Sequence, residues 1–319
     1  MIRQDTLSEA PEDLQPDLAG GHKNWLRKVI AESTQAKVGL IVLGIFVLLA
    51  IFAPLIAPYD PRTQVGPVYA PPSLRHPLGL DDGGVDMVSL LIYGGRISLI
   101  VGFAATLIAM VIGGGIGIFS GYYGGRTDQV LMRTTDYFLV IPDLPLAIIV
   151  AAVWGPSLEH LIFVIALLLW TTTARIIRAQ VKSVRERVYV KRARSLGASD
   201  FRIITRHVLP QIGPLLIANT VLTIAVAIFD ETALAFLGLA DPTSITWGTT
   251  IEFSFLRTAI SSGAWWAVIP AGLCVALVIM ACFWLGQAIE DALNPRLKVS
   301  YISPRSFRFR AVPREEDAG

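Results

Sequence analysis

Long apolar runs separated by short polar segments dominate the pattern along the chain. A helix rises about 1.5 Å per residue, so roughly 20 apolar residues cross a hydrocarbon layer about 30 Å thick. We predict a membrane-spanning helix over each of six runs: 38–58, 97–120, 135–155, 158–174, 212–238 and 264–289. The ten-residue alternating segments typical of a membrane β-barrel are absent from the sequence. The pattern therefore predicts an all-α, polytopic fold with six transmembrane helices in a lipid bilayer.

Two of these runs, 135–155 and 158–174, are joined by a very short turn and should form a helical hairpin. The first of them contains Pro142 and Pro145 beside Asp143, which predicts a kink near the middle of the membrane. The second apolar run of the chain ends in a glycine-rich stretch, GGGIGIFSGYYGG. Small residues allow helices to approach closely, so we expect this end to be buried against neighbouring helices.

Composition and charge agree with a membrane protein and predict its orientation. Of 319 residues, 53% are hydrophobic and only 16% are charged, with a mean hydropathy of +0.58. Segment 173–211 holds ten Lys or Arg against two acids and therefore belongs in the cytoplasm. Segments 59–95 and 239–263, assigned to the outside, carry three basic residues between them. With six spans, both termini are then cytoplasmic.

The remaining segments complete the predicted organisation. Residues 1–21 are acidic and contain Pro, which predicts a disordered cytoplasmic tail rather than a signal peptide. Residues 22–36 are basic and amphipathic and predict an interfacial helix, although a basic flank that only sets topology explains them equally well. Residues 37–96 hold the first transmembrane helix and an external loop, 97–298 hold a core of five transmembrane helices, and 299–319 form a second cytoplasmic tail.

Motifs for catalysis are missing from the sequence. It contains no GxxxxGK[ST] loop for nucleotide phosphates, and no HExxH, CxxC or GxSxG motif. The four histidines are scattered over both predicted sides of the membrane, where they do not form a ligand set. We therefore predict that the chain is not an enzyme and that it holds no metal and no cofactor.

Three acids lie within the predicted spans: Asp143 in the third, and Asp230 and Glu231 toward the outer end of the fifth. A charge there costs a few kcal/mol even on mild insertion scales, so each acid should face a cavity or a partner. One interpretation is that these acids line a polar path. The alternative is that threonines and backbone groups satisfy them locally.

The basic segment 181–210 has a defined shape as well as charge. VKSVRERVYVKRARSLG predicts an amphipathic helix with Val184 and Val188 on one face. Gly197 should end this helix, because glycine readily adopts the left-handed conformation. Ser199 should cap a second, short helix that Pro210 ends or kinks. The pattern predicts a helix, a sharp corner and a second helix on the cytoplasmic surface.

Three interpretations of this segment compete. It could be a topology signal, which is the commonest reason for a basic loop. It could bind anionic lipid or nucleic acid, which requires positive charge but no fixed corner. It could dock a cytoplasmic partner, which requires a defined corner. Charge alone favours the first interpretation.

Spacing favours the third. Ala193, Gly197 four residues later, and the HVLP ending at 207–210 resemble the EAA loop of ABC importer permeases, here 183–210. In that family, this loop docks in a cleft of the ATP-binding subunit. The resemblance implies that the ATPase-coupling residues are Ala193, Leu196, Gly197, Ala198, Ser199, Asp200, Leu209 and Pro210.

The resemblance covers about residues 25–298 and is closest to the dipeptide, oligopeptide and nickel permeases, C-type subunit. It is carried by HPLGLDDGGVDMVSLLIYGGRISLIVG, GYYGGRTDQVLMRTTDYFLVIPDLPLAI, ETALAFLGL with Trp247–Gly248, and DALNPRLK. The chain departs from the family pattern at two places. Lys191 and Arg192 stand where the loop has Glu-Ala, and Val85 stands where relatives commonly have an arginine.

The resemblance implies a type I importer fold and a permease subunit of the bacterial plasma (inner) membrane. Such a subunit pairs with a homologous second permease, two ATP-binding subunits that hydrolyse the ATP, and an external solute-binding protein, and binds no nucleic acid. Asp143, Asp230 and Glu231 would then belong to a translocation path for di- or oligopeptides. The rival interpretation is an ion-coupled secondary transporter that uses the same three acids, but the internal repeat common in such transporters is absent.

Overall fold

The computed structural model describes residues 29, 31 and 33–293. The two tails predicted at 1–21 and 299–319, and most of the interfacial helix predicted at 22–36, lie outside these residues. The described part of the chain is helical and contains no strand. Its elements are α2 (Thr34–Ile51), α3 (Ala53–Ile56), α4 (Met87–Tyr123), α5 (Gly125–Val140), α6 (Asp143–Trp154), α7 (Leu158–Arg185), α8 (Val188–Ser195), α9 (Asp200–Ile203), the π-helix η2 (Ile204–Val208), α10 (Leu209–Phe236), α11 (Trp247–Leu256), the 3-10 helix η3 (Trp265–Ala267) and α12 (Ile269–Leu293).

The predicted polytopic fold is confirmed. Within the described residues, five helical segments are long and apolar enough to cross a membrane: Thr34–Ile51, Met87–Tyr123, Leu158–Arg185, Asp200–Phe236 and Trp265–Ala292. The bent pair α5 and α6 supplies a sixth crossing if it counts as one span. The longest segments, of 37 residues, extend well past the hydrocarbon layer, because a helix of that length spans about 55 Å.

The third predicted span, 135–155, is not one kinked helix. α5 ends at Val140, α6 begins at Asp143, and the two are bent by 86°. Ile141 is extended, with φ −78° and ψ 125°, because the ring of the following Pro142 disfavours the helical conformation in the residue before it. The predicted kink is therefore a complete break in the helix.

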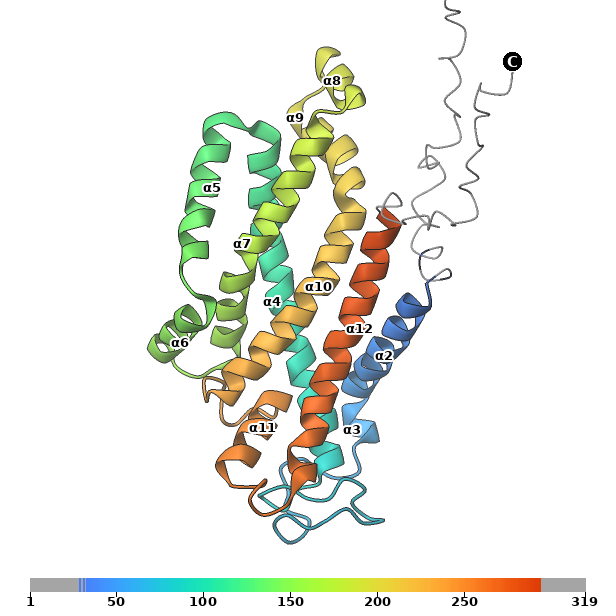
Figure 1. The fold of residues 1–319 in the computed structure, drawn as a ribbon, viewed down its shortest axis with the longest axis vertical. Helices are drawn as coiled ribbons and strands as arrows, with labels where there is room; N and C mark the ends of the chain where they lie inside the picture. Colours follow the sequence, from blue (N-terminus) through green and yellow to red (C-terminus); the bar gives the residue numbers. More distant parts are fainter. Residues whose placement is uncertain (1–28, 30, 32, 294–319) are drawn as a thin grey trace, which may run out of the picture.

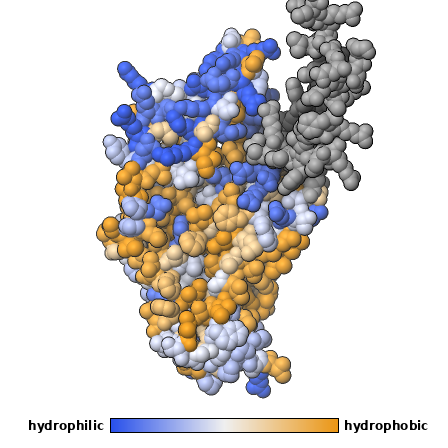
Figure 2. All heavy atoms as spheres, in the orientation of Figure 1, coloured by the Kyte–Doolittle hydropathy of each residue, from blue (hydrophilic) through white to orange (hydrophobic). Residues whose placement is uncertain are grey.

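The molecule has two chemically different ends (Figures 1 and 2). α8 and α9 lie at one end, where the surface is strongly hydrophilic, and α3, α11 and loop 57–86 lie at the other. A broad hydrophobic zone lies between them, over the middle of the helical bundle. Segments 173–211 and 239–263 therefore end on opposite sides of the apolar zone, in agreement with the charge pattern.

α4 and α7 pack at backbone distance through glycines spaced four residues apart. A Cβ atom added at Gly113 would lie 2.3 Å from the carbonyl oxygen of Trp170, and one at Gly117 would lie 2.6 Å from that of Ala174. At Gly121, a Cβ would lie 2.8 Å from Cβ of Val181. No larger residue fits these positions unless the helices separate, so the predicted close contact at this end of α4 is confirmed.

This contact predicts that two neighbouring glycines respond oppositely to the same substitution. Gly113→Ala should destabilise the chain by about 1–3 kcal/mol, because the new methyl group overlaps the backbone of α7. Gly114→Ala should be neutral or stabilising by up to about 1 kcal/mol, since a Cβ there meets no atom within 4 Å and alanine is the better helix former. Thermal unfolding of the detergent-extracted chain measures both. Equal effects would contradict the packing.

Candidate functional site

The predicted corner at Gly197 is present, and we define residues 188–203 as the basic corner. Gly197 has φ +78°, in the left-handed region that favours glycine. The N–H of Ala198 donates to the carbonyl of Ala193 at 3.1 Å, and the N–H of Gly197 donates to that of Arg194 at 3.0 Å. These two bonds form a Schellman motif, which satisfies the last carbonyls of α8 and fixes the direction in which the chain leaves it.

The helix predicted before the corner is not continuous. α7 ends at Arg185, and α8 begins at Val188 after an extended Arg187 with ψ 143°. Val184 is buried at the end of α7, whereas Val188 is exposed, so the prediction that these two valines share one face is wrong. The break turns α8 so that Val190 is buried instead, in an apolar cluster with Val184 and Ile203.

The helix after the corner is longer than predicted. Ser199 precedes α9 in an extended conformation, but its side chain forms no capping hydrogen bond. α9 then continues through η2 into α10, giving one helical segment from Asp200 to Phe236 that Pro210 does not end. Proline lacks an N–H and its ring conflicts with the carbonyl four residues before it, and the wider π turn ahead of Pro210 accommodates both. The basic corner is therefore continuous with a membrane span.

Tyr122, at the end of α4, holds the basic corner in place. Its hydroxyl donates to Oδ1 of Asp200 at 2.6 Å, and the guanidinium of Arg194 lies 5.2 Å from the centre of its ring. Ala193 and Ala198 pack against the apolar cluster that contains Tyr122. Tyr122 was not predicted as a site residue, because nothing in the local sequence links it to a segment about 75 residues later.

The outer surface of the basic corner is apolar at its tip and basic around it. The side chains of Leu196 and Phe201 are 87% and 77% exposed. Lys191 pairs with Glu186 through an Nζ–Oε2 distance of 2.9 Å, which lowers the pKa of Glu186, and Arg192 is exposed. Phe201 was also missed as a site residue, although a phenylalanine between Asp200 and Arg202 was a visible signal.

The eight predicted coupling residues fall into two groups. Four lie exposed at the tip of the basic corner: Leu196, Gly197, Ser199 and Asp200. Four are half-buried beneath it: Ala193, Ala198, Leu209 and Pro210. The fold brings the first group to the surface and makes the second group the base that supports it.

The three intramembrane acids occupy different environments. Glu231 is fully buried, and its Oε2 accepts a hydrogen bond from Oγ of Ser98 at 3.0 Å. The same Ser98 oxygen accepts the N–H of Trp247 at 3.2 Å, so α4, α10 and the start of α11 meet at this carboxyl group. Asp230 is half-buried and Asp143 is exposed. The other oxygen of Glu231, Oε1, is buried without a hydrogen-bond partner among the described residues, so local groups satisfy this acid only in part, while Asp143 and Asp230 remain accessible for a path.

No set of three or more potential metal ligands occurs among the residues that the structure describes. The hydrogen-bond partners of Glu231 are the hydroxyl groups of Ser98 and Thr232 rather than other acids or imidazoles. The acids therefore offer no arrangement for holding a metal ion within residues 29, 31 and 33–293.

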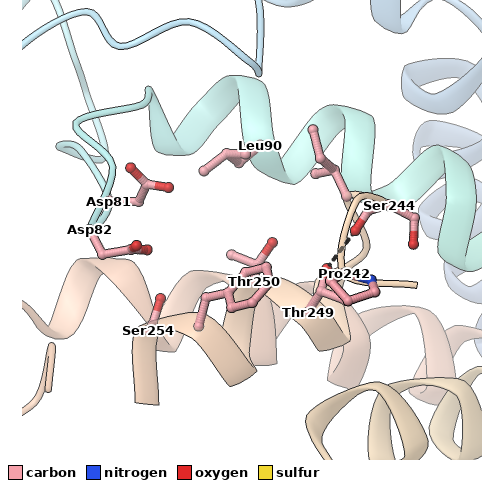
Figure 3. A pocket seen from close by; sticks show the side chains of 10 residues that line it. Asp81, Asp82, Leu90, Pro242, Ser244, Thr249, Thr250 and Ser254 are labelled. Carbon is pink, nitrogen blue, oxygen red and sulfur yellow. Dashed lines mark hydrogen bonds between the residues drawn. The ribbon is translucent and has the colours of Figure 1, made fainter. Parts of the chain in front are cut away.

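At the end of the molecule opposite the basic corner, a small cleft separates loop 57–86 from α11 (Figure 3). Asp81 and Asp82 border it on one side, and Thr249, Thr250 and Ser254 of α11 face them across a volume of about 70 Å³. Asp82 forms an ion pair with Arg257, just after α11, which holds the loop against the helix. Val85 packs among the apolar residues beneath this loop.

Two protein-family descriptions match the chain. Residues 113–299 match the "binding-protein-dependent transport system inner membrane component", and residues 32–72 match the "N-terminal TM domain of oligopeptide transport permease C". Together they cover the basic corner, the intramembrane acids and the first span.

Individual relatives of the chain are also transport system permease proteins. The chain is 35% identical to a dipeptide transport system permease protein of Alkalihalophilus pseudofirmus, over 85% of this chain and 89% of that protein. It is 36% identical to a di/tripeptide transport system permease protein of Pseudomonas aeruginosa, over 82% and 88%. It is 35% identical to an oligopeptide transport system permease protein of Bacillus subtilis, over 82% and 86%.

The burial of Asp81 beside this cleft predicts that the stability of loop 57–86 depends on pH. Burial raises the pKa of Asp81 from 3.8 to about 6, although the N–H groups of Val85 and Gly83 donate to its Oδ1. The folded loop thus binds this proton more tightly than the unfolded loop, and its stability should fall as pH rises from about 4 through about 6. Hydrogen-exchange protection of the Val85 amide should fall accordingly.

Asp81→Asn keeps a carbonyl acceptor for both amides and removes the titration, so protection should become independent of pH. Asp60→Asn is the control, because Asp60 accepts the N–H of Arg62 in a similar turn of the same loop but is exposed. A pH dependence that survives in Asp81→Asn would assign it to another group.

Proposed function

Because this chain belongs to the inner membrane permeases of binding-protein-dependent ABC importers, in the peptide group, we propose that it forms one half of a translocation path for di- or oligopeptides. The other half is a homologous second permease. Two ATP-binding subunits hydrolyse the ATP, and an external solute-binding protein delivers the peptide. The basic corner and both termini then lie in the cytoplasm, as the positive-inside rule requires.

The observation that carries this proposal is the exposed apolar tip of a rigid corner. Leu196 directly follows α8 and Phe201 belongs to α9, and both helices lie beyond the hydrophobic zone, at the hydrophilic end of the molecule, where lipid tails cannot cover exposed side chains. Apolar side chains that protrude in this way mark a surface for a protein partner. A topology signal requires charge alone and leaves both side chains unexplained. We assign the tip to the ATP-binding subunit.

The basic corner is also connected to the spans in a way that suits the transmission of movement. Asp200 begins the helical segment that continues to Phe236, and Arg185 ends the span that precedes α8. A displacement of the tip therefore acts directly on two membrane helices. When the two ATP-binding subunits close on ATP, this displacement turns the spans toward an outward-facing state, and hydrolysis reverses it.

The charge of the basic corner predicts the charge of the cleft that receives it in the ATP-binding subunit. Family members offer a glutamate at the position of Lys191, so a basic contact in the partner's cleft would meet a cation here. Glu186 already pairs with Lys191 within this chain, which removes part of that conflict. Arg192 remains available, and we expect an acidic residue of the ATP-binding subunit opposite it.

For the path itself, we assign different roles to the three acids. Asp143 begins α6 at the break in the third span, and Asp230 is half-buried on α10, so both are accessible to a permeating solute. Glu231 is enclosed between α4 and the start of α11. It contributes to the path by holding these helices together rather than by touching the peptide.

The proposal predicts that the left-handed conformation of Gly197 is required for coupling. Gly197→Val should sharply reduce peptide uptake per ATP hydrolysed, because a β-branched residue at positive φ is strained by about 1–3 kcal/mol and would straighten the corner. A Cβ at this position meets no atom within 4 Å, so the effect comes from the backbone alone. Uptake of labelled di- and tripeptides and ATP hydrolysis are measured together in proteoliposomes that contain the copurified complex.

Gly197→Asn is the matched variant, because asparagine tolerates the left-handed conformation. It should retain most of the coupling although it is larger than glycine. Normal uptake and normal peptide-stimulated hydrolysis in Gly197→Val would rule out the proposed role of the corner. Uptake that needs no ATP in the unaltered protein would instead favour a secondary transporter.

A further inference from the structure

α5 attaches to the rest of the chain along one narrow face. Its buried residues are Asp128, Met132 and Thr135, spaced as on one side of a helix. Most of its other side chains are exposed. Asp128 is the one charged residue among the three, so it is the feature of α5 that most needs an explanation.

Asp128 accepts four hydrogen bonds. Arg178 donates from Nε to Oδ1 at 2.5 Å and from Nη2 to Oδ2 at 2.7 Å. Lys182 donates to Oδ2 at 2.7 Å, and Oγ of Ser120 donates to Oδ1 at 2.5 Å. Both carboxylate oxygens are thus fully used, in the bidentate geometry that makes an arginine pair strong and directional. The partners come from α7 and α4, so one side chain joins three helices.

The same end of α4 contacts the basic corner. The turn between α4 and α5 begins with Gly124 at φ +68°, where a Cβ would lie 2.7 Å from Nη1 of Arg185. That nitrogen donates to the carbonyl of Tyr122 at 2.9 Å, and the hydroxyl of Tyr122 donates to Asp200. A continuous set of contacts therefore leads from the corner, through the end of α4, to the carboxylate of Asp128.

At its far end, α5 stops at the break before Asp143. Because α6 departs there at 86°, any movement of α5 along its axis shifts the break and the acid that follows it. The pair of Asp136 with Arg175, at 2.6 Å, is a second contact between α5 and α7, but both side chains are more than half exposed. Exposed ion pairs contribute little, which leaves Asp128 as the firm attachment.

We propose that Asp128 is a positioning residue that fastens α5 to the α4–α7 pair, so that movement of the basic corner reaches the break at Asp143. This inference rests on the proposed function, in which the corner receives the movement of the ATP-binding subunits. It also assigns Arg178 and Lys182 a role beyond setting topology, since both donate hydrogen bonds to this carboxylate.

The test compares Asp128→Asn with Asp136→Asn in the complete reconstituted transporter. Both variants remove one acid that pairs with α7, but Asp128 and Arg178 are 12% and 30% exposed, whereas Asp136 and Arg175 are 55% and 52% exposed. Asp128→Asn should lower peptide uptake per ATP hydrolysed by about tenfold while hydrolysis continues. Asp136→Asn should match the unaltered protein, and Asp128→Glu, which keeps the anion, should recover most of the loss.

Equal uptake per ATP hydrolysed in Asp128→Asn and Asp136→Asn would overturn the inference. It would also be overturned if Asp128→Glu lost as much uptake per ATP hydrolysed as Asp128→Asn. Loss of ATP dependence in the unaltered transporter would contradict the proposed function instead, so the two failures are distinguishable.

A measurement on native Asp128 covers the case in which Asp128→Asn fails to assemble. Spin labels are placed at Arg133 on α5 and Ser183 on α7, two exposed positions, with Cys274 and Cys282 replaced by alanine. If Asp128 fastens the helices, the distance between the labels stays the same in the nucleotide-free and ATP-trapped complexes. A distance that changes with nucleotide would show that α5 slides on α7 and would refute the inference.

Discussion

The contact between the backbones of α4 and α7 sets the position of every other functional element. Gly113, Gly117 and Gly121 leave no space for side chains between the two helices, so the relative register of the helices is fixed over the turns that contain these glycines. α7 continues toward the basic corner, and α4 ends beside it, at Tyr122. α4 also carries Ser98 to the carboxyl group of Glu231 near the opposite end. A single tightly packed pair thus links the two ends of the molecule.

The helices around the basic corner are continuous at some points of the chain and interrupted at others. The Schellman turn at Gly197 and the π-helical passage into α10 keep the corner continuous with its span. Extended residues interrupt the helices at Arg187 and at Ile141–Pro142. Interfaces and packed cores change by moving as bodies rather than by bending continuously. Movement at the basic corner should therefore displace whole helices and reach the interruption at Ile141–Pro142.

Local signals explain what could be predicted from the sequence. Apolar length identified the spans, and the glycine at 197 identified the corner, because both follow from the conformational preferences of neighbouring residues. Pairings between distant residues could not be predicted in this way. Arg178 and Lys182 were counted as topology signals, and only the fold shows that Asp128 binds both. The continuity of 200–236 was missed for a related reason: Pro210 normally breaks a helix, and the π turn that accommodates it has no clear sequence signature.

The central claim is that the tip of the basic corner meets a subunit that hydrolyses ATP. A photo-crosslinking amino acid at Leu196, in the complex within its native membrane, tests this most directly, with Leu74 at the opposite end as a fully exposed control position. The account predicts that the Leu196 probe captures a protein with a GxxxxGK[ST] loop, in a yield that changes with nucleotide, and that the Leu74 probe does not. Capture of lipid alone at Leu196, or of a protein without a nucleotide site, would contradict it.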